Sequence, residues 1–88
     1  MNKASAYAAL AEELSRWQMM SVDQLVELIG REPTRMEIEL PEGSVQLEVT
    51  VHWRDHKHRV LAVRAIAYGP AHWHTERLQE ECTVPVQF

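Results

Sequence analysis

The histidines are the residues of this sequence whose type and spacing could support chemistry, namely metal binding. Three of the five histidines fall in the stretch VHWRDHKHRV at 51–60, and the other two flank a tryptophan in the triplet HWH at 72–74. Structural zinc takes four ligands, and catalytic zinc takes three and a water, most often from histidine and cysteine. A zinc or nickel site could therefore draw one pair of ligands from each group, giving the set His56, His58, His72 and His74.

No familiar metal-binding motif supports such a site. The sequence contains neither HExxH nor CxxC, and Cys82 is its only cysteine. Nothing in the sequence requires the HWH triplet to fold back onto residues 56–58. The strand patterns described below instead place His56 and His58 at the tip of a hairpin, in solvent. Metal binding is therefore the alternative interpretation, and solvent-facing turn residues are the leading one.

Other catalytic groups fall into no recognisable pattern. The motifs GxSxG, GxxxxGK and GxGxxG are absent, and three glycines in all leave no glycine-rich loop to cradle a phosphate. We expect Cys82 to be a buried thiol without an activating base. The remaining acid–base candidates are expected on outward positions of helices and strands, where no burial would raise the pKa of one carboxyl above that of another. They are Glu12, Glu13, Glu37, Glu39, Glu48, Glu80 and Glu81. The sequence favours a protein that is not an enzyme and needs no cofactor.

Length and composition predict one globular domain over residues 1–88. The chain is 45% hydrophobic and 25% charged, with a formal net charge of -4 and no block of lysine and arginine, so we expect no nucleic-acid partner. A single cysteine forms no intrachain disulfide, which fits a reducing cytoplasm. Charged residues such as Lys3 and Arg16 interrupt the first segment, leaving no apolar run of secretory or membrane-spanning length.

The first thirty residues predict two helices. An apolar stripe recurs three and four positions apart in the first segment, formed by Tyr7, Leu10, Leu14 and Trp17, with Ala11 beside them. Ser21 and Gln24 form a capping box that would begin a second helix, and Gly30 would close it in the left-handed conformation. The expected buried side of this second helix comprises Val22, Leu25, Val26 and Ile29.

From Thr34 onward, apolar residues alternate with polar ones, which predicts strands with one wet face each. The first run ends at Leu40, the second begins at Val45, and the turn between them contains proline and glycine. Pairing Leu40 with Val45 brings the apolar faces together and makes residues 41–44 a four-residue loop.

The third strand is expected at Val60–Tyr68. Matching Trp53 to Leu61 keeps the apolar faces together and sets Asp55 opposite Arg59 as a pair of opposite charges. Residues 56–58 are then the loop of this second hairpin.

The C-terminal region has a weaker pattern. Residues 71–81 show little periodicity, and a short helical turn over 76–81 would point Leu78 inward. A last strand is expected beyond it, with Pro85 at a sheet edge or a strand end. Its inward side would consist of Cys82, Val84, Val86 and Phe88.

The side of the third strand that faces away from the helices is too apolar for open solvent. A single Arg64 stands there among Val60, Ala62, Ile66 and Tyr68. Either the C-terminal segment or a second subunit should cover it, and a two-fold dimer is the common symmetric solution. The predicted partner surface comprises Val60, Arg64, Ile66, Tyr68 and Trp73.

Residues 21–84 resemble a group of small bacterial proteins of unknown function. The resemblance lies in the helix SVDQLVELIG, the strands VTVHW and VLAVRAIAYG, the nearby Trp73 and the closing LQEECTVP. The histidine-rich tip and the HWH triplet depart from that group. The resemblance implies an α+β domain, and it carries no activity and no site residues.

These observations predict an α+β fold with two N-terminal helices on one face of an antiparallel meander of three or four strands. The leading functional hypothesis is a non-enzymatic interaction or accessory module that acts as a homodimer in the cytoplasm, without membrane or nucleic-acid partners. The second is the histidine-lined metal-binding protein. The third is a small-molecule binder that uses a pocket between the helices and the sheet.

Overall fold

A computed structural model describes residues 3–41, 43–69 and 77–86. Two helices precede four strands along the chain. In order they are α1 (Lys3–Gln18), α2 (Val22–Glu27), β1 (Thr34–Leu40), β2 (Gly43–Trp53), β3 (Val60–Tyr68) and β4 (Arg77–Pro85).

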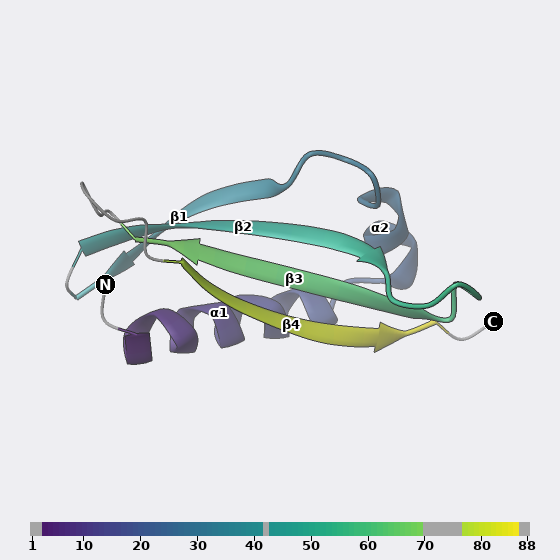
Figure 1. Ribbon diagram of the computed structural model, residues 1–88, viewed down its shortest axis with the longest axis horizontal. Helices are drawn as coiled ribbons and strands as arrows, with labels where there is room; N and C mark the ends of the chain where they lie inside the picture. The colour runs from purple at the N-terminus through teal and green to yellow at the C-terminus, as the bar shows by residue number, and fades with distance from the viewer. Residues whose placement is uncertain (1–2, 42, 70–76, 87–88) are drawn as a thin grey trace.

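The four strands form one antiparallel sheet in the order β1-β2-β3-β4, so each strand pairs with its neighbour in sequence. Helix α1 packs along β3 and β4, and α2 lies near the end of the sheet where β2 finishes (Figure 1). Both helices contribute to the same apolar core on one face of the sheet. The predicted α+β meander is thereby confirmed.

The core lies between α1 and the inward side chains of β2 and β3. Alternation along these strands sends every second residue to the same side, and Leu47, Leu61 and Val63 are fully buried there. Small residues of β3, Ala65 and Ala67, are also fully buried. Their size lets the helix approach the middle of the sheet closely.

The register of the second hairpin is confirmed, since Trp53 pairs with Leu61 as the shared apolar faces required. The predicted register of the first hairpin is wrong. Leu40 pairs with Gly43 and Ile38 with Val45, so only two residues separate β1 from β2. The actual pairing differs from the expected one by two positions. A shift of two keeps every side chain on its own face, and periodicity alone does not detect it.

Helix α1 is turned slightly from its predicted orientation. Tyr7 is 40% exposed and Ala11 is exposed, whereas Ala6 and Glu13 face the core. The remaining buried residues of the helix are Ala9, Leu10, Leu14 and Trp17. The stripe therefore runs through Ala6 rather than Tyr7, because the shorter side chain lets the first turn approach the sheet.

Helix α2 begins as predicted and ends earlier. The Ser21 hydroxyl accepts a hydrogen bond from the Gln24 backbone at 3.2 Å, and the Gln24 side chain accepts one from the Ser21 backbone at 3.2 Å. Gly30 has the expected positive φ of 78°. The expectation that Val26 is buried is wrong, since its side chain is 38% exposed while Leu25 is fully buried.

The helical turn expected over 76–81 is also wrong, because residues from Arg77 onward belong to β4. Leu78 does face the core, as predicted, and it pairs with Ala67 of β3. Pairing with β3 supplies the hydrogen bonds that the weak local pattern does not predict. Pro85 ends β4, which is an edge strand, so its missing N–H interrupts nothing.

Truncating neighbouring residues of α2 tests the helix orientation. We expect Leu25→Ala to lower the free energy of unfolding by about 2–5 kcal/mol, because it leaves a cavity in the core. Val26→Ala should change it by less than about 1 kcal/mol, since that side chain is partly in solvent. Urea unfolding followed by circular dichroism measures both, and equal losses would contradict the orientation.

Candidate functional site

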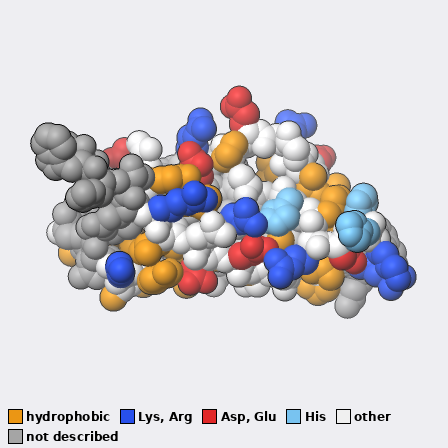
Figure 2. All heavy atoms as spheres, in the orientation of Figure 1, with side chains coloured by type: hydrophobic (Ala, Val, Ile, Leu, Met, Phe, Trp, Pro, Cys, Tyr) orange, Lys and Arg blue, Asp and Glu red, His pale blue; other side chains and the backbone are white. Residues whose placement is uncertain are grey.

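The helices cover one face of the sheet, and we call the opposite face the outer face. Every second residue of each strand points to it, as the register requires. Its side chains are mainly polar on β1, β2 and β4, and mainly apolar on β3. Figure 2 shows charged and apolar side chains interleaved over the sheet in this view.

The predicted partner surface lies on this outer face. Val60, Arg64, Ile66 and Tyr68 occupy alternating positions of β3, and each is half-buried. None of the four is open to solvent to the degree expected for an uncovered strand. Trp73, the fifth residue of the predicted surface, lies outside the described residues.

An ion network centred on Glu81 explains part of this burial. The Glu81 carboxylate on β4 accepts a hydrogen bond from Arg54 at 2.9 Å and one from Arg64 at 3.5 Å. The His52 Nε2 atom lies 3.8 Å from the same carboxylate. Arg54 and His52 emerge from β2 and its loop, so their side chains must cross β3 to reach β4. Ala62 lies beneath this crossing and is fully buried.

A second polar cluster lies further along the outer face. Arg35 of β1 pairs with Glu48 of β2 at 3.1 Å, and the Tyr68 hydroxyl donates to the other Glu48 oxygen at 3.5 Å. Ile66 pairs across the sheet with Glu48, which places it between the two clusters. The outer face therefore has an apolar centre on β3 with charged groups on both sides.

The prediction that His56 and His58 lie at a hairpin tip is confirmed, since both are exposed in the loop between β2 and β3. The His58 ring stacks on Trp53, with centroids 4.5 Å apart and planes 4° apart. Its backbone φ of 56° turns the chain at this point. Stacking holds the imidazole against Trp53 at the end of β2.

Asp55 closes the base of the same loop. Its carboxylate accepts hydrogen bonds from the backbone N–H of Arg59 at 2.9 Å and of Val60 at 3.2 Å. The Arg59 N–H donor holds the pKa of this carboxyl below its ordinary value of 3.8, and the Val60 N–H and the Arg59 charge act in the same direction. The expected pairing of Asp55 with Arg59 is thus made through the Arg59 backbone N–H.

The four-histidine metal site stays a prediction. Within the part of the chain that the structure describes, no group of three or more His, Cys, Asp or Glu side chains is placed to hold an ion. His72 and His74 lie outside that part. A small-molecule pocket between the helices and the sheet also stays a prediction; a hollow of about 260 Å³ opens elsewhere, beside Glu37, Gln46 and Tyr68.

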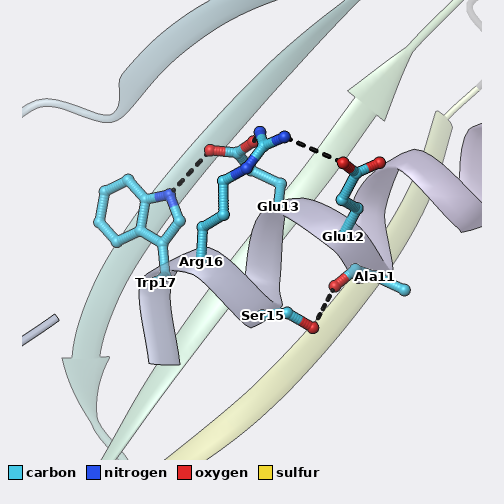
Figure 3. Close-up of polar contacts among 6 residues, drawn as sticks. All are labelled: Ala11, Glu12, Glu13, Ser15, Arg16 and Trp17. Carbon is cyan, nitrogen blue, oxygen red and sulfur yellow. Dashed lines mark hydrogen bonds and ion pairs between the residues drawn. The ribbon is translucent and has the colours of Figure 1, made fainter. Parts of the chain in front are cut away.

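Sequence reasoning missed a buried carboxylate on α1. Glu13 was expected outward, and it is instead buried in the helix face that packs on the sheet. The Trp17 indole donates to one of its oxygens at 3.2 Å, and Arg16 donates to the other at 2.8 Å (Figure 3). Arg16 also reaches Glu12 at 2.9 Å. The spacings of three and four residues to Arg16 and Trp17 are the signal that could have revealed this pairing.

The Glu13 side chain has a structural role. Both carboxylate oxygens have donors, so neither is presented to a substrate. Cys82 is likewise unsuited to nucleophilic attack, because burial, helped by the negative charge of Glu81, raises the pKa of its thiol. Its side chain is half-buried against the core, in line with the expected inward position.

Comparisons with known proteins leave the family open. No family model, no curated protein and no solved structure matches this chain. The resemblance to small bacterial proteins therefore stays a prediction. Neither helix in the described ranges has both the length and the apolar character needed to cross a membrane.

Removing the buried carboxylate should destabilise the fold. Glu13→Ala leaves the Trp17 indole without its acceptor, which should cost about 1–3 kcal/mol in the free energy of unfolding. Glu13→Gln keeps an acceptor and should lose less. Glu12→Ala, at a side chain that is 70% exposed, should change the value by no more than about 0.5 kcal/mol. Urea titration compares the three, and equal losses at positions 12 and 13 would contradict the assigned role.

The hydrogen bonds to Asp55 predict a pH dependence. The charged form of the Asp55 carboxylate is more stable in the native state than in the unfolded state. Its contribution to folding stability is therefore fully present above the ordinary pKa of 3.8. It is lost as pH falls through the lower native pKa. The wild type should therefore melt above Asp55→Asn at pH 7, and the two melting temperatures should converge in acid. A difference that stays constant down to the lowest pH measured would refute the assignment.

Proposed function

We propose that this protein is a non-enzymatic interaction module that works as a homodimer through the outer face of its sheet. The observation that carries the proposal is the half-buried apolar centre of β3, on a face that neither helix covers. Val60, Ile66 and Tyr68 stand there in a row, and charged side chains of both signs flank them.

The composition of the face supports an interface. Stable interfaces have an apolar centre that is poor in charge and a polar rim that stays wet. Here the centre is the outward row of β3, in which Arg64 is paired with Glu81, and the Arg54–Glu81 and Arg35–Glu48 pairs flank it. These ion pairs already neutralise much of the charge within one molecule. A partner would therefore not have to desolvate unpaired ions.

The size of the outer face also supports a homodimer interface. The molecule measures 44 × 22 × 16 Å, and Figure 1 looks down the shortest axis onto the spread strands. A stable interface takes roughly 800 Å² from each partner. A sheet face of these dimensions offers an area of that order, so one copy could cover another without further elements.

The proposal predicts a reversible dimer that one substitution breaks. Sedimentation equilibrium from micromolar to millimolar concentration should show the wild type passing from monomer to dimer. Ile66→Glu places a charge at the centre of the interface and should weaken association by at least about a hundredfold, equivalent to about 2.7 kcal/mol.

The matched control is Val26→Glu, which adds the same charge on α2, away from the outer face. It should associate like the wild type, and circular dichroism should show that both variants are folded. A wild type that stays monomeric at millimolar concentration would overturn the proposal, and so would an Ile66→Glu variant that associates as well as Val26→Glu.

A further inference from the structure

We propose that the second copy docks in an antiparallel orientation, with the basic loop of each molecule lying on the acidic end of the other. This inference rests on the proposed function, because it specifies how two outer faces meet. We call residues 54–59 the basic tip, and the exposed pair Glu37 and Glu39 on the outer face of β1 the acidic end.

Charge is distributed unevenly along the molecule. The basic tip holds three of the nine lysines and arginines, Arg54, Lys57 and Arg59, and only one of the thirteen acidic residues, Asp55. The other six basic residues stand against twelve acidic ones. An acidic body therefore carries one basic end, where the side chains of 56–59 are exposed. Figure 2 shows histidine and basic side chains gathered at the right-hand end, where Figure 1 places the loop between β2 and β3.

The basic tip and the acidic end lie at opposite ends of the outer face. Glu39 pairs with Ser44 at the start of β2, and Arg54 follows the last residue of β2. Ten residues separate positions 44 and 54, which corresponds to about 33 Å at roughly 3.3 Å per residue. The Debye length at physiological salt is about 8 Å. The two ends are therefore screened from each other within one molecule, and each remains available to a partner.

Two-fold symmetry leaves two aligned ways to stack the outer faces. If the axis runs along the strands, the basic tips meet each other, and the acidic ends, which lie on edge strand β1, fall at opposite edges of the stack. If the axis lies in the sheet plane across the strands, each basic tip lies over the start of β2 in the other copy, next to its acidic end. The first arrangement brings like charges together at the tips and pairs no opposite charges. The second brings opposite charges together twice, so the charges select the antiparallel dimer.

The occupant that this pattern fits is a second copy of the chain. Symmetry makes each favourable contact occur twice in the dimer. Lys57 and Arg59 would face Glu37 and Glu39 of the other copy, and the apolar residues of β3 would meet at the centre. Charges at the rim add orientation and speed of association more than affinity. The apolar centre and the charged ends consequently have separate roles, and separate variants can test them.

Charge reversal tests the orientation. The tip-reversed variant is Lys57→Glu with Arg59→Glu, and the end-reversed variant is Glu37→Lys with Glu39→Lys. Each alone sets like charges against each other in the antiparallel dimer and should raise the dissociation constant at least about tenfold at low salt. The chain that carries all four substitutions restores both contacts with inverted sign and should return to within about threefold of the wild type.

The control for altered net charge is Asp23→Lys with Glu27→Lys on α2, at two exposed positions away from the outer face. It makes the same change in charge as the end-reversed variant and should leave the dissociation constant unchanged. Sedimentation equilibrium measures all variants, and circular dichroism verifies that each is folded.

The outcomes separate this inference from the proposed function. Weakening by each reversal alone, with recovery in the fourfold variant, supports the antiparallel dimer. If the wild type dimerises and Ile66→Glu disrupts it while the reversals have no effect, the orientation is wrong and the interaction module stands. A dimer that either reversal tightens would also contradict the orientation, because the antiparallel contact requires each reversal to set like charges together. If the wild type stays monomeric, both proposals fail.

Discussion

The two-residue period of β2 and β3 is the constraint on which the rest of the structure depends. It divides each strand into one row of apolar side chains that face the helices and one row that lies on the outer face. Pairing Trp53 with Leu61 aligns the helix-facing rows of both strands. Leu47, Leu61 and Val63 then form a continuous surface that α1 and α2 close from one side. Because both helices are used on that side, nothing in the described residues is left to form a second layer over the outer face.

The outer face is the side of the sheet that neither helix covers. On β1, β2 and β4 it carries the polar residues of an ordinary wet surface, whereas β3 places Val60, Ile66 and Tyr68 there. Within one molecule, Arg54 and His52 reach across β3 to Glu81 and partly shield this row. Such shielding leaves a half-buried apolar row on β3. In the proposed dimer the same charged groups would lie beside the contact.

Much of the fold could be predicted from the sequence, and the failures have specific physical reasons. Alternation fixed the faces of β2 and β3, and the capping box at Ser21 fixed the start of α2. The β1–β2 register was missed because a shift of two residues leaves the faces unchanged. Strand β4 was missed at Leu78 because pairing with β3, rather than its own periodicity, makes it a strand. The partner surface expected at Val60, Arg64, Ile66, Tyr68 and Trp73 stays a prediction, although the first four lie together on the outer face. The Glu81 network depends on residues distant in sequence and was not predicted. Glu13 was missed because a charged residue was assumed to face solvent.

The chain contains two tyrosines, Tyr7 and Tyr68, and they report on opposite sides of the molecule. Tyr7 lies on the solvent side of α1, 40% exposed, and Tyr68 lies on the outer face. Fluorine NMR of protein labelled with 3-fluorotyrosine, recorded as concentration rises, tests most directly whether the uncovered sheet face is the one that associates. The account predicts that the Tyr68 resonance shifts with concentration while the Tyr7 resonance does not. A shift confined to Tyr7, or no shift at either position, would contradict it.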